Sequence, residues 1–327
     1  MIFRRIAAAV GLAALAAFAW PAIQQRSALA QTPASLQIFV PAAPGGGWDQ
    51  TGRAIEFAMR TDGIIKEFKF EHAPGAGGAV GLPKFLAAKK GQGDALMVGG
   101  MVMVGALVAN KSPVSMRDLT PIARLTGEFE VIVVNAASPI KSMKDLVDAF
   151  KADPGKVSWA GGSAGGTDHI LAGMIAKAVG IDPRKVSYVA YAGGGPAVAA
   201  LLGNQVTCGI SGYGEFAEQI KAGKFRALAI SADKRQPGID IATLKEQGID
   251  VELFNWRGVF GAPGLAPDKQ AALIGLIEKM VNSPAWQAEL KKKDWAGIYL
   301  PGAEFGRYLD SEIARITAIL KDLGLAS

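Results

Sequence analysis

Cysteine and histidine are scarce in this sequence of 327 residues. There is one cysteine, Cys208, and there are two histidines, His72 and His169. A single cysteine excludes a disulfide framework and a four-cysteine zinc site within the chain. Two histidines leave little for metal ligation or acid–base catalysis, so we expect neither a metal nor a cofactor. Cys208 lies in an apolar run and is predicted to be a small buried hydrophobic residue.

Charge is also limited, because charged residues make up 20% of the chain, apolar residues make up 50%, and the net charge is +6. This composition excludes disordered, collagen-like and coiled-coil classes. Without the three arginines of the first thirty residues, the net charge would fall from +6 to +3. That excess is too small to indicate a nucleic-acid partner. The length exceeds what one hydrophobic core usually serves, so we expect two lobes.

A long apolar run occurs only at the N-terminus. Arg4 and Arg5 precede the run Ile6–Trp20, and Ala28-Leu29-Ala30 is a small-residue cleavage pattern. The run is shorter than the roughly 20 residues that cross a bilayer, which favours a secretory signal peptide over a membrane anchor. We therefore predict cleavage after Ala30 and an exported protein that is not itself membrane-inserted. Export without disulfides fits the bacterial periplasm.

Apolar runs alternate with helical patterns after residue 31, which predicts an α/β fold. Several runs are continuously apolar, as in parallel strands covered on both faces, so each lobe is expected to be a mostly parallel sheet flanked by helices. Crossovers near 130–135 and 255–258 would divide the chain into lobe 1, residues 31–132 plus 257–327, and lobe 2, residues 133–256. The predicted strands are Leu36–Val40, Phe68–His72, Leu96–Val98, Val131–Val134, Val157–Ala160, Val186–Val189, Val206–Ile210 and Phe225–Ile230.

Glycine gathers in four clusters at predicted strand-to-helix junctions: Pro44–Asp49, Pro74–Gly78, Gly161–Thr167 and Gly193–Pro196. Glycine lets backbone N–H groups face a ligand, and the helix that follows adds unpaired N–H groups and partial positive charge. Simple tight turns would need fewer glycines. Four such loops at one cleft would bind a small molecule with several carboxylates.

One pattern offers a rival function. Gly161–Gly165 matches the G-x-S-x-G elbow of serine hydrolases, with Ser163 as the nucleophile. His169 is the only histidine after this serine, and it follows in the same turn or helix, where it cannot adopt triad geometry. An exported serine hydrolase is therefore the alternative. We favour Ser163 as a neutral donor to a carboxylate and Thr167 as a helix N-cap.

The ordered set of motifs resembles a known family. The matching stretches are Pro41–Asp49, Pro74–Gly81, Asp153–Lys156, Gly161–His169, Tyr191–Pro196, Ala222–Ala229, Thr243–Gly248, Asn255–Gly258 and Ala262-Pro263. Together they are similar to the periplasmic solute-binding receptors of tripartite tricarboxylate transporters, the TctC or Bug type. The resemblance covers nearly the whole chain after the leader.

This resemblance implies a two-lobed periplasmic-binding-protein fold of the type II kind, with the ligand in the cleft between the lobes. It implies a non-enzymatic receptor that captures a di- or tricarboxylate, with a citrate-like ligand favoured. The partners would be two integral-membrane transporter subunits, and a monomer is the default state. A signalling receptor with the same fold remains open.

The resemblance also implies site residues. Family receptors hold a ligand carboxylate through amides and ordered water at the first two glycine loops. Carried over, those residues are Gly45, Gly46, Gly47, Asp49, Ala76, Gly77 and Gly78, with Ser163, Thr167 and His169 from the opposite lobe. Asp49 is expected to organise its loop, because a free carboxylate facing an anion would repel it. His169 has a second possible role as a packed core residue.

Three further side chains are candidates. Trp48 stands where the family has a small residue, so it would narrow the pocket or offer a stacking face. Arg257 could pair with an additional ligand carboxylate, or it could form a salt bridge within the protein. Tyr213 could present its phenol to the cleft or lie in the core.

Overall fold

The computed structural model describes residues 33–326, and the predicted signal peptide lies outside them. Within this range the strands are β1 (Ser35–Val40), β2 (Glu67–His72), β3 (Ala95–Gly100), β4 (Thr120–Asn135), β5 (Ser158–Gly161), β6 (Ser187–Ala190), β7 (Cys208–Gly212), β8 (Phe225–Ile230), β9 (Phe254–Gly261) and β10 (Ala296–Pro301). The α-helices are α1 (Gly47–Thr61), α2 (Gly81–Ala88), α3 (Met101–Ala109), α4 (Met143–Ala152), α5 (Thr167–Ala178), α6 (Gly194–Leu202), α7 (Tyr213–Lys221), α8 (Pro267–Val281), α9 (Pro284–Lys292) and α10 (Gly302–Asp322).

The predicted α/β architecture is confirmed, and each of the eight apolar runs overlaps a strand. The N-terminus of α4 shows how local sequence sets a boundary. Ser142 Oγ accepts a hydrogen bond from the N–H of Asp145, and the Asp145 carboxylate accepts one from the N–H of Ser142. This reciprocal capping satisfies two backbone donors that the helix leaves unpaired.

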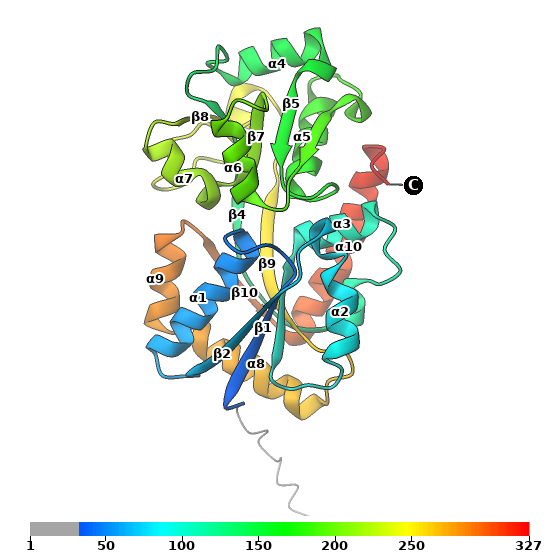
Figure 1. Ribbon diagram of the computed structural model, residues 1–327, viewed down its shortest axis with the longest axis vertical. Coiled ribbons are helices and arrows are strands. Elements are labelled where there is room, and N and C mark those ends of the chain that lie inside the picture. Colours follow the sequence, from blue (N-terminus) through cyan, green and yellow to red (C-terminus); the bar gives the residue numbers. More distant parts are fainter. Residues whose placement is uncertain (1–32, 327) are drawn as a thin grey trace, which may run out of the picture.

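The lobes are joined by β4 and β9, which run between the upper and lower groups of elements in Figure 1. Residues 120–129 of β4 pair with β9, whereas residues 130–135 pair with β7 and β8. The expectation of mostly parallel sheets needs correction. Strand β1 pairs in parallel with β2 and β3, and β5 pairs in parallel with β6 and β7. Every pairing of β4 and of β9, however, is antiparallel. The predicted lobe division itself stays a prediction.

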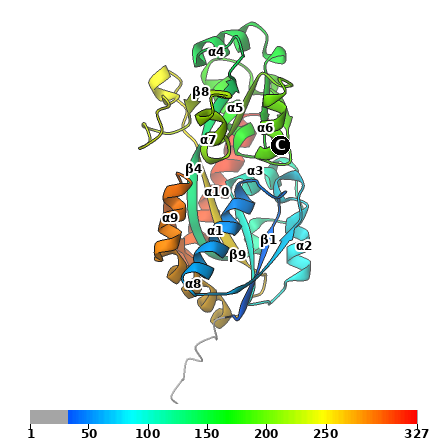
Figure 2. The same ribbon diagram turned by 60° about the vertical axis from the view of Figure 1, so that its left-hand side comes forward.

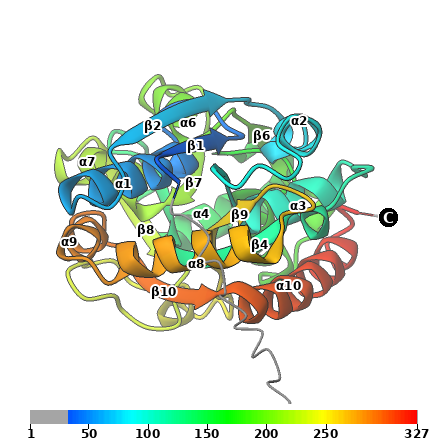
Figure 3. The ribbon, with the colours of Figure 1, turned by 90° about the horizontal axis from the view of Figure 1, so that it is seen from below.

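Helices cover the lower sheet on both sides: α1 and α9 lie on one side, and α2, α3 and α10 lie towards the other (Figures 1 and 3). Figure 2 shows the two lobes stacked, with β4 passing from one to the other. Large apolar side chains fill the interior; Trp256 on β9 packs edge-on against Phe305 of α10. Cys208 is fully buried, as predicted. Across residues 33–326, none of the helices combines the length and apolar character that crossing a membrane requires.

Candidate functional site

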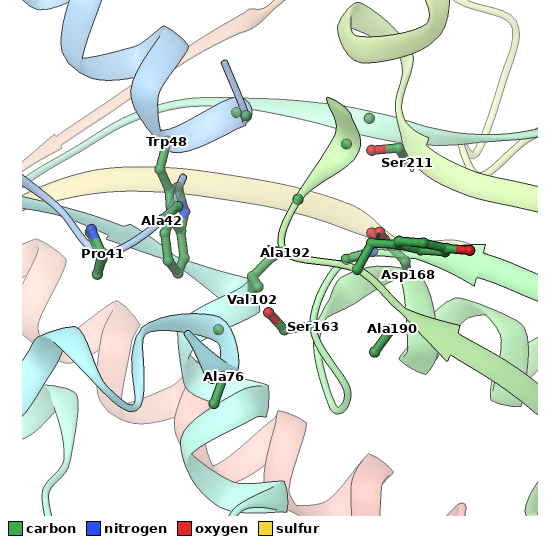
Figure 4. Close-up of a pocket in the computed structure, with 18 of the residues that line it drawn as sticks. Pro41, Ala42, Trp48, Ala76, Val102, Ser163, Asp168, Ala190, Ala192 and Ser211 are labelled. Atoms are coloured by element: carbon green, nitrogen blue, oxygen red, sulfur yellow. Dashed lines mark hydrogen bonds between the residues drawn. The ribbon is translucent and has the colours of Figure 1, made fainter. Parts of the chain in front are cut away.

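A cavity of about 370 Å³ lies where the two lobes meet beside the crossing strands. Residues of all four glycine clusters line it, together with side chains from β7, α7 and β9. In Figure 4, Trp48 and Ala76 lie on one side of the cavity, and Asp168 and Ser211 lie on the other. Loops from both lobes thus enclose one space, as the clustering of glycine predicted.

The first glycine loop is fastened by Asp49 in the first turn of α1. Its Oδ2 accepts a hydrogen bond of 2.9 Å from the N–H of Gly45, and its Oδ1 lies 2.7 Å from Nε2 of His72. Partial burial acts to raise the pKa of Asp49, but the bonds from Gly45 and His72 hold it below its usual value. Asp49 therefore organises the loop and leaves the first N–H groups of α1 facing the cavity.

The second and third loops meet across the cleft. Gly77 has a left-handed backbone with φ +58°, and a Cβ there would collide with the Cβ of Ala106 and lie 3.1 Å from the Cβ of Ser163. The Ser163 hydroxyl lies 3.4 Å from the same point. Glycine is thus required at 77 for both conformation and close approach. The contact brings the backbone of one lobe against a hydroxyl of the other.

The structure separates the predicted site residues into two groups. Gly46, Gly47, Trp48, Ala76, Gly77, Ser163 and Arg257 line the cavity. Gly45, Asp49, Gly78, Thr167, His169 and Tyr213 do not. The residues of the second group are therefore not in position to touch a ligand in this cavity.

Thr167 is the first residue of α5 and not its N-cap, which is Gly166 with no side-chain capping bond. Its hydroxyl is buried and has no hydrogen-bond partner within residues 33–326. Asp168, one residue later, accepts a 2.6 Å bond from the N–H of Gly162 and so fastens the loop to the start of the helix. The expected capping role of Thr167 is wrong.

His169 has the packed role that the sequence left open. Its Nδ1 accepts a hydrogen bond of 3.1 Å from the N–H of Gly165, and its ring stacks on Tyr188 with centroids 4.2 Å apart. Burial lowers the pKa of His169 to about 4, so the ring is neutral at physiological pH. A neutral ring that accepts the Gly165 bond at Nδ1 carries its proton on Nε2, so neither ring nitrogen is free to act as a base for Ser163.

We predict that the His169 ring signals titrate with a midpoint near pH 4 in the folded protein, whereas an unfolded histidine titrates at about 6.5. The unfolded chain therefore binds this proton more readily, and the stability contribution of His169 is lost as pH falls from about 6.5 to 4. Proton NMR, assigned with a His169→Gln variant, measures the midpoint. A midpoint near 6.5 would show that the ring is solvated.

Tyr213 lies in the core of the second lobe and is 6% exposed. It lines a separate, smaller cavity on the other side of β4, next to Trp295. Of the two roles left open for Tyr213, the structure therefore places it in the packed one.

Arg257 lines the main cavity from β9, but its charge is engaged inside the protein. Its guanidinium pairs with Glu128 of β4, and its Nη2 lies 4.0 Å from Oε1 of Glu215 at the start of α7. The side chains of Arg257 and Glu128 are 3% and 2% exposed. The Nη1 of Arg257 has no hydrogen-bond partner in the described part of the chain.

Three carboxyl groups, those of Glu128, Glu130 and Glu215, lie near this arginine, and Asp168 lies near these acids. Burial, with the neighbouring carboxylates, raises the pKa of Glu130 well above its usual value. Burial raises the pKa of Asp168 to about 7. Burial also raises the pKa of Glu215, and the positive charge of Arg257 partly offsets that increase. With one cation among these acids, the pKa values of Glu130, Asp168 and Glu215 all lie above their usual range. Sequence reasoning did not select these acids, Ser211 or Asn255 as site residues, because they lie in segments far apart in the chain and only the tertiary structure brings them together.

Residues 33–326 contain no group of three or more histidine, cysteine, aspartate or glutamate side chains placed to hold a metal ion. A family model described as the tripartite tricarboxylate transporter family receptor matches residues 64–325. The chain belongs to this receptor family.

Relatives of the receptor agree with the assignment. It is 28% identical to the UPF0065 protein in the gbd 5' region of Cupriavidus necator, over 98% of this chain and 97% of that protein. The structure of the periplasmic binding protein BugD superposes with a TM-score of 0.81 at 21% identity, covering 89% of this chain and 98% of that one. The structure of MatC from Rhodopseudomonas palustris with bound malate superposes with a TM-score of 0.77 at 22% identity, covering 88% of this chain and 99% of that one. The two-lobed periplasmic-binding-protein fold is confirmed.

Proposed function

We propose that this receptor captures a small organic carboxylate in the cavity between its lobes. The observation that carries the proposal is the convergence of glycine loops at helix starts on one enclosed space. The free N–H groups there can hold a carboxylate without cationic side chains. The malate bound by MatC supports this class of ligand. The sequence-based preference for a di- or tricarboxylate, citrate-like above all, stays a prediction.

The remaining parts of the proposal concern transport. The chain would be exported through residues 1–30, remain a monomer in the periplasm and deliver its ligand to two integral-membrane subunits. Family membership supports this role. Closure of the lobes about β4 and β9 would trap the ligand and present a closed receptor to the membrane.

A thermal-shift panel on the purified protein, refolded to remove any co-purified ligand, tests the proposal. It compares tricarboxylates, C4 dicarboxylates, aromatic carboxylates, acidic amino acids and neutral sugars. A ligand at 100 times its Kd adds about 2.7 kcal/mol, which raises Tm by several degrees. We expect shifts with carboxylates and none with sugars. A shift with a neutral compound alone would contradict the proposal.

Ser163→Ala separates a receptor from the alternative serine hydrolase. Ser163 lies at the meeting point of the loops, so losing one hydroxyl donor should weaken carboxylate binding by about 3- to 10-fold, measured by calorimetry. Ser311→Ala on exposed α10 is the matched control and should change nothing. Ester hydrolysis by the natural protein that Ser163→Ala abolishes would instead establish the hydrolase.

A further inference from the structure

The carboxylate of Glu215 occupies one of the anion-binding positions of the cleft. Glu215 belongs to the second lobe, yet its Oε1 lies beside Gly47 at the start of α1 in the first lobe. Ser211 Oγ donates a 2.7 Å bond to its other oxygen. The Nη2 of Arg257 lies 4.0 Å from Oε1. An internal carboxylate therefore lies at the helix N-terminus that would otherwise face a ligand.

Two glycines make room for this carboxylate. A Cβ added at Gly47 would lie 2.8 Å from Oε1 of Glu215 and would collide with the Arg257 guanidinium. A Cβ at Gly194 would lie 2.8 Å from Cδ of Glu215 and would collide with its Oε2. Neither glycine has positive φ, so space and not backbone conformation accounts for them. The position of Glu215 is built into the loops on both sides.

The charges along the cavity are therefore unequal. The second loop, at Ala76 and Gly77, faces Ser163 and offers backbone and hydroxyl donors. The other end is lined by Asp168 and Glu215, and Arg257 is the only cationic side chain among the cavity's lining residues. Glu128 already engages that cation. A second ligand carboxylate at this end would meet two acidic side chains and a cation that is already paired with Glu128 and keeps only its Nη1 without a partner.

We propose that Glu215 sets the ligand class of the receptor, namely an acid with one carboxylate at the second glycine loop and a hydroxyl or amine donor facing Glu215 and Asp168. The inference rests on the proposed function. Trp48 lines the cavity on the same side as Ala76 in Figure 4 and gives an apolar wall for the skeleton of the ligand. A dicarboxylate or citrate would have to displace Glu215 from its position beside Gly47, or bind with its second carboxyl group protonated.

Matched ligands test this inference by calorimetry. The ligands are built on two skeletons, a six-carbon chain and a benzene ring. Every ligand carries one carboxylate, and its other end carries a second carboxylate, a hydroxyl, an amine or only hydrogen. In the natural protein we expect the best hydroxyl- or amine-ended acid to bind at least about tenfold tighter than the dicarboxylate of the same skeleton. Glu215→Gln should remove the negative charge and reduce this ratio at least about tenfold.

Glu218→Gln, on the exposed side of the same helix, is the matched control and should leave the ratio unchanged. Ser211→Ala, which removes a donor that fixes Glu215, should reduce the ratio in the same direction as Glu215→Gln. The inference is overturned if dicarboxylates bind as tightly as the donor-ended acids, or if the ratio in Glu215→Gln equals that in Glu218→Gln. If carboxylates bind but no donor-ended acid does, the inference fails alone. If no carboxylate binds at all, the proposed function fails with it.

Discussion

Replacing Arg257 with methionine is expected to destabilise the protein by about 3–5 kcal/mol and to lower Tm by roughly 6–20 °C. Methionine fills much of the volume but leaves Glu128 buried without its partner and removes the positive charge near Glu130 and Glu215. The remaining carboxylates must then be protonated on folding. The loss should therefore be larger at about pH 8 than at pH 5.

Arg117→Met is the control for this measurement. Arg117 also pairs with a carboxylate, Asp310, but the two side chains are 52% and 62% exposed. Such an exposed pair contributes at most about 1 kcal/mol. Thermal melts followed by circular dichroism at both pH values give the comparison. Equal losses for the two variants, or a loss in Arg257→Met that does not depend on pH, would contradict the buried-cluster account.

Gly77→Ala is expected to weaken binding of the tightest carboxylate by at least about tenfold. The added methyl would meet Ala106 within its own lobe and Ser163 across the cleft, so the lobes could not close to the same extent. The substitution also carries backbone strain of about 1–2 kcal/mol because of the positive φ.

Gly63→Ala separates the backbone strain from the contact across the cleft, because Gly63 has φ +65° and no atom lies within 4 Å of an added Cβ. Both variants should lose stability, but only Gly77→Ala should lose affinity in calorimetry. Equal affinities for the two variants would mean that contact between Gly77 and Ser163 has no part in binding.

The fold was largely predictable because most strands are runs of apolar residues bounded by glycine and polar turns. The strand β9 and the first part of β4 escaped that pattern. They bury Thr126, Glu128, Asn255 and Arg257, which apolar-run reasoning excludes from strand interiors. Their polar character follows from their position, since they cross between the lobes beneath the cavity. The strands that carry the site are thus the least recognisable from sequence.

The sequence predicted the backbone loops of the candidate site but not the arrangement of its charged side chains. Glycine clusters are local features, so the sequence placed Gly46, Gly47 and Gly77 correctly at the cavity. The acidic cluster joins Glu130, Asp168 and Glu215 from separate elements, and only the tertiary structure brings them together. Arg257 was a visible candidate, but its engagement by Glu128 depends on the pairing of β4 with β9.

A crystal structure of the refolded protein with the tightest-binding carboxylate of the panel tests the central claim most directly. The account predicts ligand density in the interlobe cavity, with a carboxylate within hydrogen-bond distance of the amides of Ala76 and Gly77 and of the Ser163 hydroxyl. A ligand bound outside this cavity, or one whose carboxylate contacts none of these groups, would contradict it.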